Sequence, residues 1–252
     1  MRTVVVGASS GLGRCIGVGL AKRGAQVAMM GRRPERLETA ARQAGNGAVP
    51  IACDVTNETA CYAAIDEAAR RLGGIDALVY TPAIGPLAPL AEVDAATWRR
   101  VFDTNVVGAA RVTSAAIGHL QAGSGTAVYL SSVSASMTPP WPGLGAYIVS
   151  KAALDKLVEA WRAEHPTVRF TRLVVGDCGG GEGEARSEFS EGWDPDLAAQ
   201  FGTVWLERGY LAGALVDADE LVSVVDAVLR SGPSLSMPTV TVVPRRPGES
   251  NP

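Results

Sequence analysis

The sequence predicts one α/β domain in which helices cover both faces of a parallel β-sheet. Short β-branched or apolar runs alternate with helical patterns along the chain, and this alternation is typical of parallel sheets. A chain of 252 residues is long enough to bury the core of one such domain. No internal repeat or interdomain linker is evident, so we expect one domain over residues 1–244 and a tail over residues 245–252.

The residue patterns place about seven strands and six helices along the chain. We expect strands over residues 3–6, 26–30, 48–52, 76–80, 126–131, 168–175 and 239–243. We expect helices over residues 12–23, 34–44, 57–72, 95–120, 146–164 and 218–230. The segment at about 176–212 breaks the alternation, because it is rich in Gly and Glu up to Gly192 and then carries aromatic residues. Such a long segment is typical of a lid or binding loop, and a surface excursion is the alternative.

A glycine-rich turn follows the first expected strand and leads into the first helix. Its sequence is Gly7-Ala-Ser-Ser-Gly-Leu-Gly13, so Ser9, Ser10 and Leu12 lie between its glycines. Glycines permit a tight turn and close backbone approach, and a helix N-terminus presents unpaired amides to a phosphate. In this strand–turn–helix context the motif indicates a dinucleotide-binding loop, although an ordinary turn is the alternative.

Two arginines follow the second expected strand. In dinucleotide-binding folds an acidic residue at this strand end binds the ribose 2′-hydroxyl, whereas an arginine accommodates a 2′-phosphate. The acid is missing here, and Arg32 and Arg33 stand in its place. This favours NADP(H) over NAD(H), and a solvated loop is the alternative.

Tyr147 and Lys151 form a Tyr-x-x-x-Lys pair at the start of an apolar helical pattern. Residues four apart share one helix face, so the phenol and the ammonium can point into the same site. A free tyrosine ionises near pH ~10, and a neighbouring cation is expected to lower its pKa towards the working range. The pair alone is weak, but Leu-Ser-Ser at 130–132 and the glycine-rich turn strengthen it.

Composition argues against several other classes of protein. The net charge is −3 and the pI about 5.5, so no basic surface suggests a nucleic-acid partner. We see no apolar stretch long enough to span a membrane and no signal peptide, and we expect a cytoplasmic location. The chain has four cysteines without metal-ligand spacing and only two histidines, so we expect no metal site.

With these motifs in this order, the chain resembles the short-chain dehydrogenases/reductases, in the single-domain branch with a Rossmann-type, doubly wound sheet. The resemblance covers roughly residues 1–244. It rests on residues 7–13, Asp54-Val55, Asn105, Ser132 and the Tyr147–Lys151 pair.

The resemblance implies a role for each matching residue. Tyr147 would exchange a proton with the substrate oxygen, which Ser132 would hold. Lys151 would lower the tyrosine pKa and bind the nicotinamide ribose, and Asn105 would hold a water that leads from Lys151 to solvent. Asp54 would meet the adenine edge. The cofactor contacts would come from Gly7, Ser9, Ser10, Gly11, Leu12, Gly13, Arg32, Arg33, Asp54, Val55, Thr81, Pro82, Ala83, Tyr147, Lys151 and Gly176.

The chain departs from the family pattern at four places. Val6 replaces a threonine before the first glycine, which removes a side-chain hydrogen bond. Tyr80-Thr-Pro-Ala83 replaces Asn-Asn-Ala-Gly after the fourth strand, which puts the geometry of that loop in doubt. Ser132 precedes Tyr147 by about two residues more than usual, so Ser134 is the alternative substrate-binding serine. Val175-Gly176 replaces Pro-Gly after the sixth strand.

Together these features favour an NADPH-dependent reductase of ketones or aldehydes that can also run in reverse. The alternative is a non-catalytic NADP-binding sensor on the same fold. The aromatic residues and Leu144 near the lid and the tyrosine suggest an apolar or cyclic substrate, although core packing explains some of them equally well: Trp193, Phe201, Trp205 and Tyr210 in the lid, and Trp141 and Leu144 near Tyr147. We expect a homodimer or homotetramer that forms through small-residue surfaces on two helices. The first surface consists of Ala109, Ala110, Val112, Ala115 and Ala116, and the second of Ala152, Leu154, Leu157 and Ala160. The alternative is that both sets of residues face the sheet of their own chain.

Overall fold

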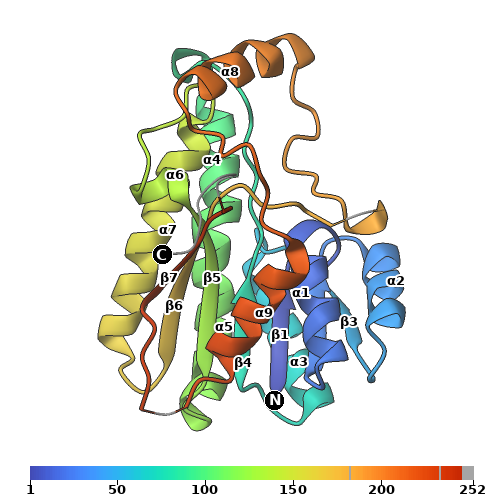
Figure 1. Ribbon diagram of the computed structural model, residues 1–252. Coiled ribbons are helices and arrows are strands. Elements are labelled where there is room, and N and C mark those ends of the chain that lie inside the picture. Colours follow the sequence, from blue (N-terminus) through green and yellow to red (C-terminus); the bar gives the residue numbers. More distant parts are fainter. Residues whose placement is uncertain (182, 233, 246–252) are drawn as a thin grey trace.

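Seven parallel strands form one sheet in the order β3-β2-β1-β4-β5-β6-β7 in the computed structural model, which describes residues 1–181, 183–232 and 234–245 (Figure 1). The chain steps outward from β1 to β3 and then returns to add β4 on the other side of β1. Ligands of open parallel sheets bind at such a reversal, beyond the carboxyl ends of the strands. The strands are β1 (Arg2–Val6), β2 (Gln26–Gly31), β3 (Val49–Ala52), β4 (Ala77–Tyr80), β5 (Thr126–Ser132), β6 (Arg169–Val175) and β7 (Thr239–Val242).

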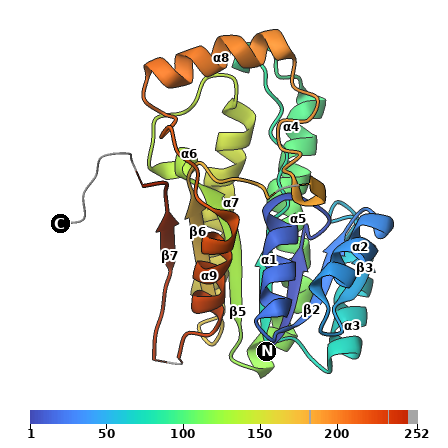
Figure 2. The same ribbon diagram turned by 45° about the vertical axis from the view of Figure 1, so that its right-hand side comes forward.

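Helices cover both faces of the sheet (Figures 1 and 2). One layer consists of α1 (Gly11–Lys22), α2 (Pro34–Ala44) and α9 (Ala218–Leu229), and the other of α3 (Glu58–Leu72), α5 (Gly108–Ala122) and α7 (Gly145–Glu164). Strand side chains alternate between the layers: Val4 and Val6 pack in the core beside α3 and α5, whereas Val5 packs beside α1 and α9. The expected doubly wound, Rossmann-type architecture is confirmed.

The expected elements agree with the structure within one or two residues, except at three places. The helix expected over 95–120 is α4 (Ala95–Phe102), a π-helical turn (Asp103–Val107) and α5. The short helix α6 (Val133–Ser136) and the helix α8 (Pro195–Glu207) were not predicted. Short 3₁₀ turns lie at Leu90–Glu92 and Gly183–Ala185. The expected tail lies outside the described residues after position 245.

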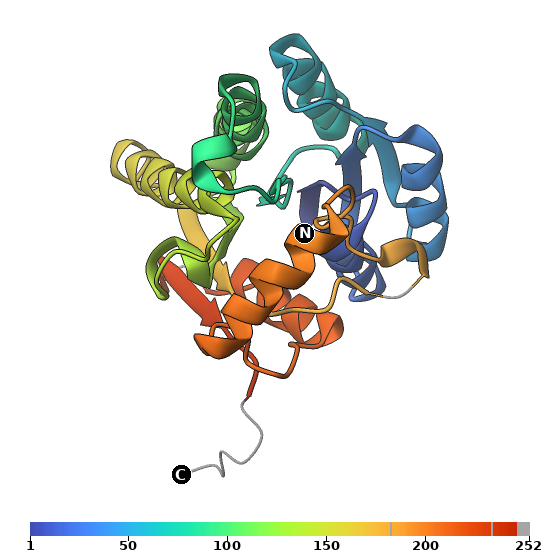
Figure 3. The ribbon, with the colours of Figure 1, turned by 90° about the horizontal axis from the view of Figure 1, so that it is seen from above.

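The lid segment, residues 176–212, crosses the carboxyl ends of the strands. Seen from above, α8 lies across the top of the molecule (Figure 3). Its N-terminus is capped by Asp194, whose side chain accepts from the backbone amides of Asp196 and Leu197. The lid aromatics form a small core of their own with the loop before α7: the ring centroids of Trp141 and Trp205 lie 5.5 Å apart. The lid is therefore folded from Asp194 through α8, whereas its described residues before Asp194 are mostly irregular, with a 3₁₀ turn at Gly183–Ala185.

The expected interface surfaces mix two kinds of position. Ala109, Val112, Ala116 and Leu154 are fully buried in the core of the chain itself, so they face the sheet. Ala152 and Ala160 are exposed. Each predicted surface was thus partly wrong, because a helix that covers a buried sheet carries small residues on its inner face as well. No helix in the part of the chain that the structure describes is long and apolar enough to cross a membrane.

Candidate active site

The glycine-rich turn lies where β1 and β4 end side by side. Val6 and Tyr80 are register partners, so Gly7 and Thr81 leave the sheet together. The Thr81 hydroxyl donates to the Val6 carbonyl at 2.6 Å. A Cβ at Gly7 or Gly13 would lie 2.3 or 2.4 Å from Thr81 Oγ1, and Gly7 has φ +85°, so both positions require glycine. Val6 has no side-chain hydroxyl, and the Thr81 hydroxyl makes a hydrogen bond at this strand end instead.

The end of β2 places one arginine against this turn. Arg33 Nη2 donates to Ser9 Oγ at 2.9 Å and to Ser10 Oγ at 2.8 Å. Ser10 is the N-cap of α1 but makes no side-chain capping bond, so the first-turn amides are left to another acceptor. Two hydroxyls, a guanidinium and a helix N-terminus together suit a phosphate.

Arg32 and Asp54 lie on the outer side of the same strand ends. Arg32 is exposed and makes no hydrogen bond within the described residues. Asp54 accepts from the amide and the hydroxyl of Thr56 at 2.9 and 2.8 Å. Burial raises the pKa of Asp54, but the Thr56 hydrogen bonds and the Arg32 charge outweigh it, so the pKa lies below its usual range. Asp54 is therefore ionised at neutral pH and can accept hydrogen bonds.

A cavity of about 510 Å³ runs from these residues to the start of α7. Every residue expected to contact the cofactor lines it, from the glycine turn and Arg33 to Tyr147, Lys151 and Gly176. It has a phosphate-binding arrangement at one end and a tyrosine–lysine pair at the other. These residues fit an extended dinucleotide.

Tyr147 and Lys151 lie on one face of the first two turns of α7, at the inner end of the cavity. Lys151 is buried, and its Nζ donates to the Leu130 carbonyl at 2.6 Å. Nζ lies 5.8 Å from the centroid of the Tyr147 ring. Burial lowers the pKa of Lys151 to about 8, and the Asp155 carboxylate opposes this shift.

The pKa of Tyr147 moves in the direction opposite to the one expected from the sequence. Burial raises it to about 12, and a hydrogen bond with Ser132 opposes the shift. Burial disfavours the charged phenolate, and Lys151 Nζ is directed at the Leu130 carbonyl. Tyr147 therefore holds its proton at neutral pH.

The structure places both candidate serines beside Tyr147. Ser132 ends β5 and caps α6, with its Oγ accepting from the Ser134 amide at 3.2 Å. The two hydroxyls lie 2.9 Å apart. Ser132 is the one whose hydroxyl affects the Tyr147 pKa, and Ser134 is largely buried. Local capping of α6 thus turns Ser132 towards the phenol.

Asn105 lies in the π-helical turn, outside the cavity lining. Its amide joins two neighbouring segments: Oδ1 accepts from the Ile84 amide at 2.9 Å, and Nδ2 donates to Ile84 O at 3.0 Å and to Ser150 Oγ at 2.8 Å. Ser150 in turn donates to the Tyr147 carbonyl at 2.6 Å. Asn105 therefore ties the loop after β4 to the first turn of α7. π-Helical turns of this kind are frequent at functional sites.

The unusual Tyr80 is accommodated by the same π-helical turn. In this turn the Gly108 amide donates its hydrogen bond to the Asp103 carbonyl and not to that of Thr104. The Tyr80 hydroxyl donates to the Thr104 carbonyl at 2.6 Å. A Cβ at Gly108 would lie 2.7 Å from the Tyr80 hydroxyl oxygen. Tyr80, the turn and Gly108 thus fit one another, and residues 81–83 still line the cavity.

A second cavity of about 480 Å³ opens beside Tyr147, on the side away from the glycine turn. Its polar groups are Ser132, Ser134, Tyr147 and Asp177, and its walls are mostly apolar: Val133, Trp141, Leu144, Val175, Phe189, Leu206, Leu211 and Leu215. Trp193, Phe201, Trp205 and Tyr210 do not line it and pack in the lid core instead. Trp141 and Leu144 are therefore the wall residues that were predicted correctly.

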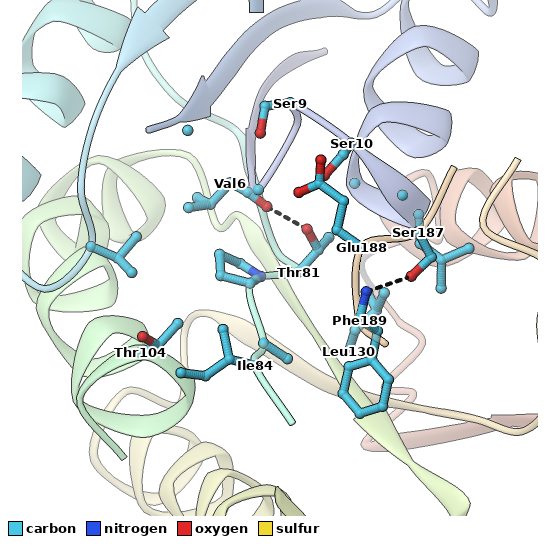
Figure 4. A pocket seen from close by; sticks show the side chains of 18 of the residues that line it. Val6, Ser9, Ser10, Thr81, Ile84, Thr104, Leu130, Ser187, Glu188 and Phe189 are labelled. Carbon is cyan, nitrogen blue, oxygen red and sulfur yellow. Dashed lines mark hydrogen bonds between the residues drawn. The ribbon is translucent and has the colours of Figure 1, made fainter. Parts of the chain in front are cut away.

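Five lid residues in the first cavity were missed from the sequence: Cys178, Ser187, Glu188, Phe189 and Glu191. Ser187, Glu188 and Phe189 are labelled in Figure 4. The Phe189 ring packs edge-on against the Tyr147 ring, with centroids 4.8 Å apart. Trp193 Nε1 anchors the following residues by donating to Gly85 O at 2.8 Å. No local pattern marks these residues, because their positions depend on the path of the lid. Among the described residues no cluster of ligands suits a metal ion.

Comparison with known proteins decides the family. A family model described as short chain dehydrogenase matches residues 2–181. The chain belongs to the short-chain dehydrogenase family. Members of this family are oxidoreductases that act on CH–OH groups and use NAD(P)(H).

Two curated relatives illustrate the match. Cis-4-hydroxycyclohexanecarboxylate dehydrogenase from Sinomonas cyclohexanicum is 40% identical over 134 residues, which cover 52% of this chain and 54% of the relative. The 11-beta-hydroxysteroid dehydrogenase-like 2 of Arabidopsis thaliana is 34% identical over 180 residues, covering 69% of this chain and 58% of the relative. The matched region thus spans little more than half the length of these relatives.

Solved structures agree with the fold over nearly the whole chain. A short-chain type dehydrogenase/reductase from Mycobacterium marinum has a TM-score of 0.80 at 26% identity, covering 96% of this chain and 93% of its own. An alcohol dehydrogenase from Thermococcus sibiricus, complexed with 5-hydroxy-NADP, has a TM-score of 0.78 at 22% identity, covering 95% and 94%.

Proposed function

We propose that this protein is an NADPH-dependent reductase of ketones or aldehydes. One observation carries the proposal: the Tyr147 phenol lies beside Ser132 and Lys151, where the two cavities meet. A phenol holds its proton at neutral pH and can give it to a carbonyl oxygen, as the reduction of a carbonyl requires. Bound NADPH supplies the hydride that such a reduction needs.

Residues of this chain bind the substrate and the cofactor and transfer the proton. Ser132 donates a hydrogen bond to the carbonyl oxygen, and Tyr147 gives that oxygen its proton. Lys151 stabilises the resulting phenolate and binds the nicotinamide ribose. Asn105 holds the loop after β4 and α7 together and borders the route by which a water returns a proton to Lys151. Asp54 faces the adenine edge.

The substrate proposed for this site is apolar or cyclic. The walls of the second cavity are mostly aliphatic and aromatic, and its polar groups include the hydroxyls of Ser132, Ser134 and Tyr147. The two curated relatives are named for a hydroxylated cyclohexane and for hydroxysteroids, both of which are cyclic alcohols. Cyclic ketones are therefore the first substrates to test.

A non-catalytic NADP sensor is the competing proposal, since the same fold hosts both functions. A sensor has no need of Ser132, Tyr147 and Lys151 in one site. The experiment is to follow NADPH absorbance with a panel of cyclic and open-chain ketones. Ketone-dependent oxidation supports the reductase, whereas saturable NADPH binding without oxidation supports the sensor.

Cofactor preference should depend on Arg33 more than on Arg32, because only Arg33 is held against Ser9 and Ser10. Arg33→Ala is expected to weaken NADPH binding by about tenfold or more and to change NADH binding little, since charge-assisted hydrogen bonds to phosphate are lost. Arg32→Ala, the matched control, should have a smaller effect. Equal losses for NADPH and NADH in Arg33→Ala would contradict a phosphate-binding role.

The proposed assembly is a homodimer or homotetramer in the cytoplasm, with the outward faces of α5 and α7 as the contact. Exposed Ala152 and Ala160 and half-buried Leu157 lie on that face of α7. Light scattering at micromolar concentration should therefore give a multiple of the 26.1 kDa chain mass. A monomeric mass would rule this assembly out.

A further inference from the structure

A carboxylate from the lid occupies the arginine-rich end of the first cavity. Glu188 accepts hydrogen bonds from Arg33 Nη1 on Oε2 and from Arg36 Nη1 on Oε1. The other terminal nitrogen of Arg33 donates to Ser9 and Ser10. Glu188 lies 155 residues from Arg33 in the sequence, so the path of the lid and not local helix spacing brings it there. This contact is not used by the proposed chemistry.

Glu188 is charged in this position. Its side chain is 27% exposed, and that of Arg33 is 34% exposed. Burial raises the pKa of Glu188, but hydrogen bonds from Arg33 and Arg36 outweigh it, so the pKa lies below its usual range. An anion held by two guanidinium groups has the chemistry of a bound phosphate monoester.

The neighbours of Glu188 connect this contact to both ends of the site (Figure 4). On one side, the Cα of Ser187 lies 3.6 Å from the position that a Cβ on Gly11 would take. On the other side, Phe189 packs on the Tyr147 ring. The carboxylate of Glu188 thus holds lid residues 183–191 down on the glycine turn and on the tyrosine.

We propose that Glu188 is a cofactor-specificity residue whose carboxylate competes with the 2′-phosphate of NADP(H) for Arg33 and Arg36. The inference rests on the proposed preference for NADP(H). The phosphate must displace Glu188 from its arginines, whereas the 2′-hydroxyl of NAD(H) has no charge with which to do so. Glu188 therefore makes the preference for NADP(H) over NAD(H) smaller than Arg33 and Arg36 would produce without it. The displacement also releases residues 183–191 from the glycine turn.

The test uses fragments that carry only the adenosine end of the cofactor. Binding of adenosine 2′,5′-bisphosphate and of 5′-AMP to the full chain is measured by calorimetry. Glu188→Gln should bind the bisphosphate about three- to tenfold more tightly than the wild type, because two partly exposed ion pairs no longer compete. Binding of 5′-AMP should stay within about twofold.

Glu184→Gln is the matched control. It removes the same charge from the same segment, but Glu184 pairs with Arg14, at 2.5 Å, and not with the arginines after β2. This variant should leave the ratio of bisphosphate to 5′-AMP affinity unchanged. An increased preference for the bisphosphate over 5′-AMP in both variants would show a general effect of charge and would overturn the proposal.

Hydrogen exchange of the wild type gives a second readout that needs no variant. Saturating bisphosphate should speed amide exchange in residues 183–191, and saturating 5′-AMP should not. No change in exchange, or an unchanged or weaker bisphosphate affinity in Glu188→Gln, contradicts the competition. Neither measurement involves turnover, so both test Glu188 independently of the proposed reaction. A failure to reduce any ketone would count only against that reaction.

Discussion

Replacing Tyr147 by Phe is expected to lower ketone turnover by about 10²–10⁴-fold, the usual contribution of a general acid–base group, and to leave NADPH affinity within about twofold. The substitution keeps the ring that packs against Phe189 but removes the hydroxyl that, in the proposed reaction, gives the carbonyl oxygen its proton. Turnover should fall without a change in fold, which circular dichroism and NADPH titration would verify.

Tyr129→Phe is the matched control for this prediction. Tyr129 is also a buried tyrosine, and its hydroxyl lies 2.6 Å from Thr113 Oγ1 in the core, away from both cavities. Loss of that hydroxyl should affect stability and not turnover per folded enzyme. Near-normal turnover in Tyr147→Phe would remove Tyr147 from the mechanism.

Replacing Lys151 by Met is expected to damage both catalysis and cofactor binding. The ammonium is the only cation at the inner end of the cavity among the residues that line it, so turnover should fall by at least about 10²-fold and NADPH affinity about tenfold. Methionine has a similar shape and buries no charge, so thermal stability should be retained or increased. A large drop in melting temperature would show that Lys151 acts through structure.

The same ammonium predicts a pH dependence for the wild type. The pKa of Lys151 is about 8, so the charged form is present below that pH and is lost as the pH rises through it. Reduction should therefore slow above about pH 8, while Tyr147, with a pKa of about 12, keeps its proton. Lys156→Met, at an exposed site on the same helix, should retain this profile. A flat profile from pH 7 to 10 would contradict the role of Lys151.

Local sequence patterns predicted the sheet and most of the cavity. The strands of this fold are short apolar runs bounded by glycine and charge, so their positions could be read directly. The glycine turn, the arginines after β2 and the Tyr147–Lys151 pair are each local in sequence, and the topology brings them to one edge of the sheet.

The residues that the lid brings to the site, the π-helical turn and the tyrosine pKa could not be predicted in this way. Glu188 and Phe189 reach the site through contacts with residues far away in the sequence, and no periodicity marks them. The π-helical turn inserts no unusual residue, so residues 95–120 looked like one helix. The Tyr147 pKa depends on burial and on the Ser132 hydroxyl, which helical spacing alone does not determine.

The most direct measurement of the central claim is the stoichiometry of NADPH oxidation and alcohol formation with purified wild-type protein and a cyclic ketone at neutral pH. Absorbance gives the NADPH consumed, and chromatography with mass spectrometry gives the alcohol. The account predicts one alcohol for each NADPH oxidised, with both signals lost in Tyr147→Phe. Saturable NADPH binding with no alcohol formed across a broad panel of ketones and aldehydes would contradict it.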